Sequence, residues 1–164
     1  MPIKHLNVER FSITSSKSFA DVLKAVEKQI GHPDLRKLVE DMASAKSDSE
    51  LQELVRAAVG PTDLMEFLRL DQGVVLRKEL GEDGPQMLRL LVGNPLTMRK
   101  MAKFVHDAGS YAPITILIDE QPDGVHLSYD RMASFLASYD NASVMEVAKG
   151  LDAAVERVLT TAAN

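Results

Sequence analysis

The sequence contains no cysteine and no tryptophan among its 164 residues. Without cysteine the chain has no disulfide bonds, thiolate metal sites or cysteine nucleophiles, and this composition fits a reducing compartment. No apolar run approaches the roughly 18 residues that a membrane-spanning helix needs. Residues 1–7 also lack the apolar segment of a secretory signal peptide. We therefore expect a cytoplasmic protein that does not bind or cross a membrane.

The chain also lacks a net positive charge and has few aromatic side chains. The net charge is −5, and the aromatic residues are five Phe and three Tyr. A negatively charged chain repels nucleic-acid phosphates at long range, and few aromatic rings are available to stack on bases. We expect no nucleic-acid partner, although a local basic patch is compatible with these totals.

What the chain does contain is typical of one globular domain spanning residues 1–164, with 45% hydrophobic and 26% charged residues. Alternating apolar residues predict a first strand over Leu6–Thr14. Apolar residues at helical spacing then predict a helix that begins after Ser18 and ends near Gly31. Two further short helical patterns lie between residues 33 and 61, and we interpret this segment as a helical insertion.

From Leu64 onward the pattern changes to that of strands. Residues 64–70 and 74–78 are separated by Asp-Gln-Gly, which predicts a hairpin. Residues 87–92 are almost continuously apolar and predict a central strand covered on both faces. Asn94 as N-cap and Pro95 in the first turn predict that a helix follows directly.

The end of the chain predicts another hairpin and two helices. Residues 114–119 and 125–130 alternate clearly and flank a Pro-Asp-Gly turn. The final helix is predicted to start with a capping box from Ser143 to Glu146. Hairpins dominate, so we expect an α+β fold with a mainly antiparallel sheet of about five to six strands and helices packed on one face.

Several of these stretches, taken in order, resemble the domain of unknown function 302 (DUF302) family. The resemblance is carried by Gly93-Asn94-Pro95, by Ala112-Pro113 before the strand Ile114–Glu120, and by His126-Leu127-Ser128-Tyr129-Asp130. It implies a curved antiparallel sheet packed on helices, similar to TATA-binding protein, and a dimer. It implies no established activity.

One candidate ligand site is the junction at Gly93-Asn94-Pro95. The free N–H groups at the start of a helix attract anions, and Arg99 and Lys103 follow on the same helix. The alternative is an ordinary cap followed by a solvated basic face. Because the helix dipole disfavours a cation in its first half, Arg99 is expected to have an acidic neighbour or an anion beside it.

A second candidate is the strand that carries His126, Ser128 and Asp130 on one face and Tyr129 on the other. If that strand lines a cavity, His126 can donate or accept a proton. This gives an enzyme hypothesis, with His126 and Tyr129 as acid and base and an anionic substrate held by Asn94 and Lys103. The alternative is a polar strand face in water, with Tyr129 in the core.

The sequence contains no motif that indicates a metal site or a cofactor site. His106-Asp107 and Asp119-Glu120 offer nitrogen and oxygen ligands, but their spacing matches no known metal motif, so we predict no metal. The sequence has no nucleophile elbow and no nucleotide-binding glycine motif, and we predict no cofactor.

The leading hypothesis is therefore a homodimeric module that binds a small ligand, with an anion as one candidate, or a protein partner. Asn94, Arg99, Lys103 and Ser128 are its candidate ligand-binding residues. The alternatives are the enzyme above and a purely structural or scaffold protein, for which residues 33–59 are the expected contact surface.

Overall fold

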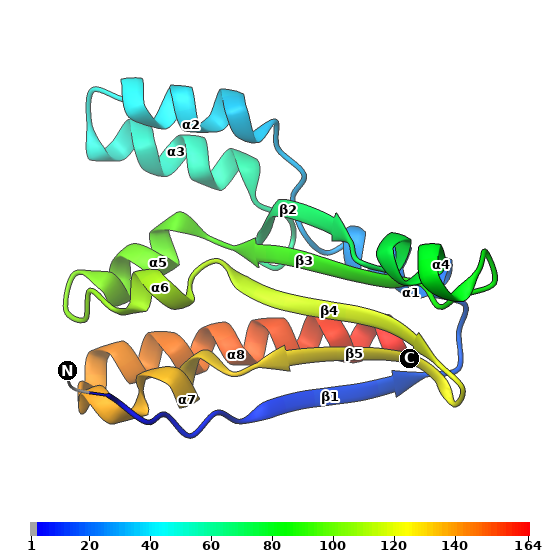
Figure 1. Ribbon diagram of the computed structural model, residues 1–164. Helices are drawn as coiled ribbons and strands as arrows, with labels where there is room; N and C mark the ends of the chain where they lie inside the picture. Colours follow the sequence, from blue (N-terminus) through cyan, green and yellow to red (C-terminus); the bar gives the residue numbers. More distant parts are fainter. Residues whose placement is uncertain (1–2) are drawn as a thin grey trace.

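The computed structural model describes residues 3–164 and shows one sheet with helices packed against it (Figure 1). The strands are β1 (Arg10–Ser15), β2 (Met65–Asp71), β3 (Met87–Gly93), β4 (Ile114–Gln121) and β5 (Gly124–Asp130). The α-helices are α1 (Phe19–Glu27), α2 (Leu35–Ser44), α3 (Asp48–Ala58), α4 (Gly73–Leu80), α5 (Pro95–Ala102), α6 (Ala108–Tyr111), α7 (Met132–Leu136) and α8 (Ala142–Ala163). A 3₁₀ turn, η1 (Ala137–Tyr139), follows α7.

The five strands lie in the order β1-β5-β4-β3-β2, and every neighbouring pair is antiparallel. The predicted hairpin is confirmed as β4 and β5, in which Gln121 lies opposite Gly124 across a two-residue turn. The first strand begins at Arg10 rather than at the predicted Leu6. The open, curved antiparallel sheet with its helices confirms the predicted α+β class.

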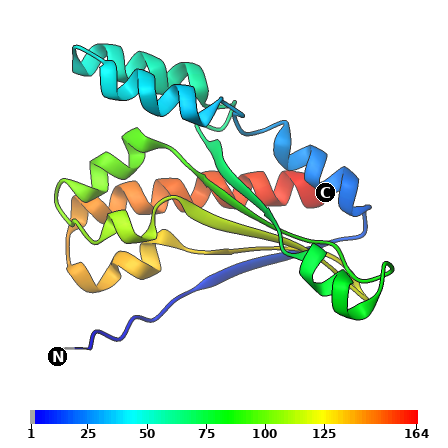
Figure 2. The same ribbon diagram turned by 45° about the horizontal axis from the view of Figure 1, so that its top comes forward.

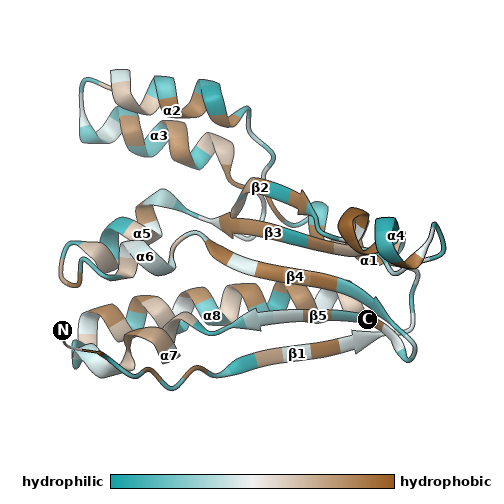
Figure 3. Cartoon of the chain, viewed as in Figure 1, coloured by the Kyte–Doolittle hydropathy of each residue, from teal (hydrophilic) through white to brown (hydrophobic). Residues whose placement is uncertain are grey.

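The helices that form the main core, such as α1, α5, α7 and α8, cover one face of the sheet. Figure 1 looks onto the other face, with α8 behind β4 and β5. Fully buried residues from both layers, such as Leu90 and Ile116 from the sheet and Val22 and Val155 from the helices, form the main core. In Figure 3 the hydrophobic segments of β3 and β4 mark the middle of the sheet. Burial of these apolar side chains between two layers is the main force that holds the domain together.

The second face of the sheet, which we call the open face, carries only α4 at one end in the described residues 3–164 (Figures 1 and 2). Along β3, Leu88 and Leu90 are buried against the helices, while the intervening Arg89 and Leu91 keep partial exposure. The prediction that β3 is covered on both faces is therefore wrong, although β3 does lie inside the sheet between β2 and β4. Its long apolar run reflects leucines on both sides of the strand, a pattern that sequence alone reads as full burial.

Residues 74–78 form a helix instead of the predicted hairpin strand. They belong to α4, and β2 pairs with β3. Asp71 accepts a hydrogen bond from the Val74 amide (3.0 Å) and another from Arg77 (3.0 Å) through its second oxygen. These bonds to Asp71, one residue before the N-cap Gln72, favour a helix over residues with good helix propensity from Leu76 to Leu80, and they outweigh the weak strand preference of two valines.

The α2–α3 hairpin is attached to the rest of the fold at a narrow base. Its apolar residues, such as Leu38 and Val55, form a cluster separate from the main core, together with Met65 and Phe67 of β2 and Leu96 of α5. At the base, the amides of Gly31 and Gly60 both donate to the Leu64 carbonyl (2.8 and 2.9 Å). A Cβ on either glycine would lie within 3 Å of the opposing backbone, so only glycine permits this approach. Figures 1 and 2 both show the hairpin projecting from the sheet.

Helix α8 is fixed at both ends. At its start Asn141 accepts from the Val144 amide (3.0 Å), so the predicted capping box at Ser143 is wrong. Ser143 already lies within the first turn, and Asn141 reaches the free N–H groups earlier. At its end the Ser15 hydroxyl donates to the Ala163 carbonyl (2.7 Å). The terminal helix is thereby tied to β1, an edge strand of the sheet. None of the helices described is both long and apolar enough to cross a membrane.

Candidate functional site

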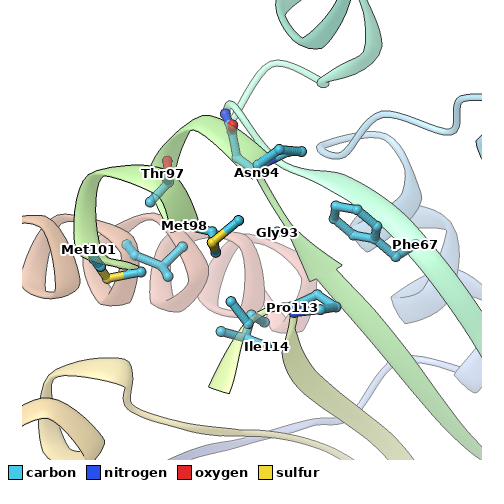
Figure 4. Close-up of a pocket in the computed structure, with 11 residues that line it drawn as sticks. Phe67, Gly93, Asn94, Thr97, Met98, Met101, Pro113 and Ile114 are labelled. Carbon is cyan, nitrogen blue, oxygen red and sulfur yellow. The ribbon is translucent and has the colours of Figure 1, made fainter. Parts of the chain in front are cut away.

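An apolar pocket lies where β3 ends and α5 begins, and we call it the β3–α5 pocket. Its volume is about 150 Å³. Figure 4 shows Phe67 and Met98 on opposite sides of Gly93, with Pro113 and Ile114 below them. The lining residues come from β2, β3, α5, α8, the start of β4 and the segment before it: Phe67, Gly93, Asn94, Pro95, Thr97, Met98, Met101, Ala112, Pro113, Ile114 and Leu151.

Asn94 fixes the geometry of this junction. Its side-chain oxygen accepts from the Leu96 amide (2.8 Å), and its amide nitrogen donates to the Asp63 carbonyl (3.0 Å). The predicted N-cap, with Pro95 in the first turn, is therefore confirmed. The side chain is buried and bonded at both ends, so its role is to hold α5 against the β2 end of the sheet. Among the predicted ligand-binding residues, Asn94 alone lines the pocket.

Gly93 is explained neither by its backbone conformation nor by crowding. Its φ lies outside the left-handed region. A Cβ built there would make ordinary contacts of 3.6 Å with Phe67 and with Pro113. Both neighbours line the pocket, so the missing methyl group is part of the open volume. Glycine in a strand lowers the stability of the fold by about 0.5–1 kcal/mol relative to alanine. At this position the absence of a methyl group leaves space in the pocket.

The pocket is suited to an apolar guest. Its walls are mainly carbon and sulfur, and the two methionines, Met98 and Met101, can adjust their shape to a ligand. Thr97 adds a hydroxyl group at the wall. No lysine, arginine or histidine lines it. An apolar cavity of about 150 Å³ can hold a molecule of the size of benzene.

The two predicted cationic ligands lie elsewhere on α5. Arg99 forms an ion pair with Asp48 of α3, which confirms the expected acidic neighbour. That hydrogen bond lowers the pKa of the Asp48 carboxyl. Lys103 is the C-cap residue of α5, at the end opposite Asn94, and its ammonium lies 4.7 Å from the centre of the Phe104 ring. The structure therefore does not combine Asn94, Arg99 and Lys103 into one anion site.

His126 and Tyr129 lie on opposite faces of β5. His126 is on the open face, where its Nε2 is 2.8 Å from Asp123 Oδ1 and this hydrogen bond lowers the pKa of Asp123. Tyr129 is 1% exposed under the helices and donates to Asp152 Oδ1 (2.6 Å). Burial, together with the Asp152 carboxylate, raises the pKa of Tyr129. In the described structure His126 and Tyr129 therefore do not converge as the enzyme hypothesis requires.

The pairs considered as metal ligands each have other partners. Asp107 accepts from the Tyr139 hydroxyl (2.5 Å), Asp119 from the Gln121 amide (2.8 Å) and Glu120 from the Gln86 backbone amide (2.9 Å). Within residues 3–164 no group of three or more His, Cys, Asp or Glu side chains is placed to hold an ion. Ser128 lies on the open face, at a second cavity.

Sequence reasoning did not find the pocket as such. Phe67, Met98, Ile114 and Leu151 come from four distant segments, and apolar residues of this kind are expected in any core. The available signal was indirect. Gly93-Asn94-Pro95 and Ala112-Pro113, which carried the family resemblance, turn out to lie together on the pocket wall.

Comparison with known proteins agrees with that resemblance. The family described as "Domain of unknown function DUF302" matches residues 40–162. A crystal structure of an uncharacterized conserved DUF302 protein from Bacillus stearothermophilus is similar, with a TM-score of 0.63 at 10% identity, covering 93% of this chain and 96% of that one. A search of curated proteins gave no significant match. No specific function follows from these likenesses. The chain belongs to the DUF302 family.

Proposed function

We propose that this protein is a binding module for a small apolar molecule, which it holds in the β3–α5 pocket. The observation that carries this proposal is Gly93, whose missing side chain keeps space open between Phe67 and Pro113. Apolar pockets with a few polar groups at the wall are the usual form of small-molecule sites. The proposal refines the ligand expected from the sequence, because the cations that would favour an anion lie outside this pocket.

Benzene is a suitable probe because it matches the size and polarity of the pocket. We expect a titration followed by ¹H–¹⁵N and methyl NMR to give saturable shifts at Gly93, Thr97, Met98 and Met101. The NMR signals of residues in the α2–α3 hairpin, such as Val39, should not shift. Shifts spread evenly over the protein, or none that saturate, would contradict the proposal.

We also propose that the protein is a homodimer that uses β2 and α4. Large apolar side chains are exposed there, namely Leu68 and Leu70 on β2 and Val74, Val75 and Leu80 on α4. Val75 is 70% and Leu80 64% exposed, and exposed apolar side chains in one region are typical of an interface. Light scattering at micromolar concentration tests this directly, since a monomer would contradict it.

Two further expectations from the sequence remain part of the proposal. The first is that residues 33–61 are an insertion in the single domain, which the separate apolar cluster and the glycine-lined base of the α2–α3 hairpin support. The second is a cytoplasmic location, which the lack of cysteine supports.

A further inference from the structure

The open face of the sheet carries an arginine whose charge has no partner in the described chain. Arg89 lies on β3 between the buried Leu88 and Leu90, so its side chain points away from the core. Its Nη2 donates to the Thr115 hydroxyl of β4 (3.2 Å). Its Nε atom is buried and has no hydrogen-bond acceptor within residues 3–164. A buried N–H without an acceptor is costly, so a shift of the guanidinium towards an acceptor bound beside it would be favourable.

The carboxylate that lines the same cavity as Arg89 is already engaged by another arginine. Asp130 of β5 accepts two hydrogen bonds from Arg10 of β1, at 2.6 and 2.8 Å. This two-pronged pair raises the pKa of Arg10 and uses both oxygens of Asp130. The local balance is two guanidinium groups against one carboxylate. One positive charge, that of Arg89, is therefore left over in this region of a protein whose net charge is −5.

Around this unpaired charge the sheet forms a cavity of about 180 Å³. Arg89, Thr115, Ser128 and Gln72 contribute a guanidinium, two hydroxyls and an amide to its wall, and the Arg10–Asp130 pair closes one side. The cavity therefore offers several hydrogen-bond donors beside a cation. A fork of N–H donors matches the oxygens of a carboxylate or a phosphate.

We propose that this cavity is a binding site for a small oxyanion, a carboxylate or phosphate group of a free small molecule, with Arg89 as its principal ligand. The oxyanion accepts from the Nη atoms of the Arg89 guanidinium, and Ser128 and Gln72 are the neighbouring donors. The site is separate from the β3–α5 pocket, because it lies on the opposite face of the sheet from α5 and α8. It therefore does not rest on the function proposed above.

The test uses inorganic phosphate and acetate as separate probes, each against sodium chloride at the same ionic strength. NMR follows the Arg89 Nε–H signal and the backbone amides of Thr115 and Ser128. We expect saturable shifts at these positions with at least one of the two probes. The two titrations also distinguish a tetrahedral from a planar oxyanion. If neither anion gives a saturable shift, the proposal is overturned.

Variants then assign the binding to Arg89. Arg89→Gln should weaken it about tenfold or more, because the charged fork is lost. Arg36→Gln is the matched control, since Arg36 is an exposed residue of α2 that pairs with Glu40, and it should bind like the wild type. Ser128→Ala, which removes a hydroxyl without changing the charge, should weaken binding several-fold and remains informative if Arg89→Gln does not fold.

Two results would overturn the assignment. The first is equal binding by Arg89→Gln and the wild type. The second is a change of oligomeric state in Arg89→Gln, measured by light scattering at the same protein concentration, since that would identify a carboxylate of another protein molecule as the partner of Arg89.

Discussion

The Tyr129 hydroxyl donates to Asp152 Oδ1 at 2.6 Å and joins β5 to α8 inside the core. The same carboxylate accepts from the amides of Met132 (2.7 Å) and Ala133 (3.2 Å), the first residues of α7. Asp152 is fully buried, and the start of α7 supplies the positive end of a helix dipole to its charge. One carboxylate therefore holds a strand and two helices together.

Replacement of Asp152 by Asn should destabilise the fold. The new amide group places N–H donors against the Ala133 amide, so that hydrogen bond is lost, and the bonds from Tyr129 and Met132 lose the charge of the carboxylate. We expect the free energy of unfolding to fall by about 2–4 kcal/mol. Urea unfolding followed by circular dichroism measures it. Glu146→Gln, at an exposed position of α8, should change it by no more than about 0.5 kcal/mol. A loss as small as the control's would show that α7 has another cap.

Stability should decrease at alkaline pH through Tyr129. Its pKa is raised in the folded state, so its contribution is complete below the ordinary value of 10.0 and is lost as the pH rises above it. The free energy of unfolding should fall by about 1.4 kcal/mol per pH unit in this range. Tyr129→Phe should lack this part of the slope. The hydrogen bond to Asp107 also raises the pKa of Tyr139, but this residue contributes the same slope to the wild type and to Tyr129→Phe. Equal slopes would refute this assignment.

The sequence predicted most elements because each depended on local features. The alternation of 125–130, the cap at Asn94 and the glycine before the α2–α3 hairpin act over a few residues, and all appear in the structure. The errors arose where a distant partner or a competing cap decided the outcome. Val74 and Val75 favour a strand, yet Asp71 starts a helix there, and β3 supplies the pairing that β2 needs.

The functional sites were harder to predict for the same reason. The sequence showed that Gly93, Asn94 and Pro95 form a junction, but not that Phe67 and Leu151 complete a pocket beside it. The sequence placed Ser128 on a polar strand face. It did not show the order of the strands in the sheet, which brings Arg89 and Arg10 to the same cavity as Ser128. The alternation of β5 did contain the information that His126 and Tyr129 point apart.

Gly60→Ala should loosen the α2–α3 hairpin. The new Cβ would lie 2.4 Å from the carbonyl carbon of Ile30, so the two backbone segments at the base must separate. We expect faster hydrogen exchange in α2 and α3, with β4 and β5 protected as before. Gly109→Ala is the control because nothing lies within 4 Å of its Cβ position. Unchanged exchange in the hairpin would contradict the proposed role of this glycine contact.

Val75→Asp should dissociate the proposed homodimer. A carboxylate in the middle of an apolar interface loses its hydration without gaining a partner, so association should weaken by at least about tenfold. Light scattering over a concentration series measures this. Val39→Asp on α2, where the valine is 56% exposed, is the matched control and should leave the dimer intact. If both variants behave like the wild type, β2 and α4 do not form the interface.

The most direct test of the β3–α5 pocket is the benzene affinity of Gly93→Ala beside that of Gly150→Ala. Both substitutions add one methyl group, but only Gly93 lines the pocket. At Gly150 the added methyl group has no neighbour within 4 Å. We predict that Gly93→Ala folds with equal or slightly higher stability and binds benzene at least about tenfold more weakly. Gly150→Ala should bind benzene like the wild type. Unchanged binding by a folded Gly93→Ala would contradict the account.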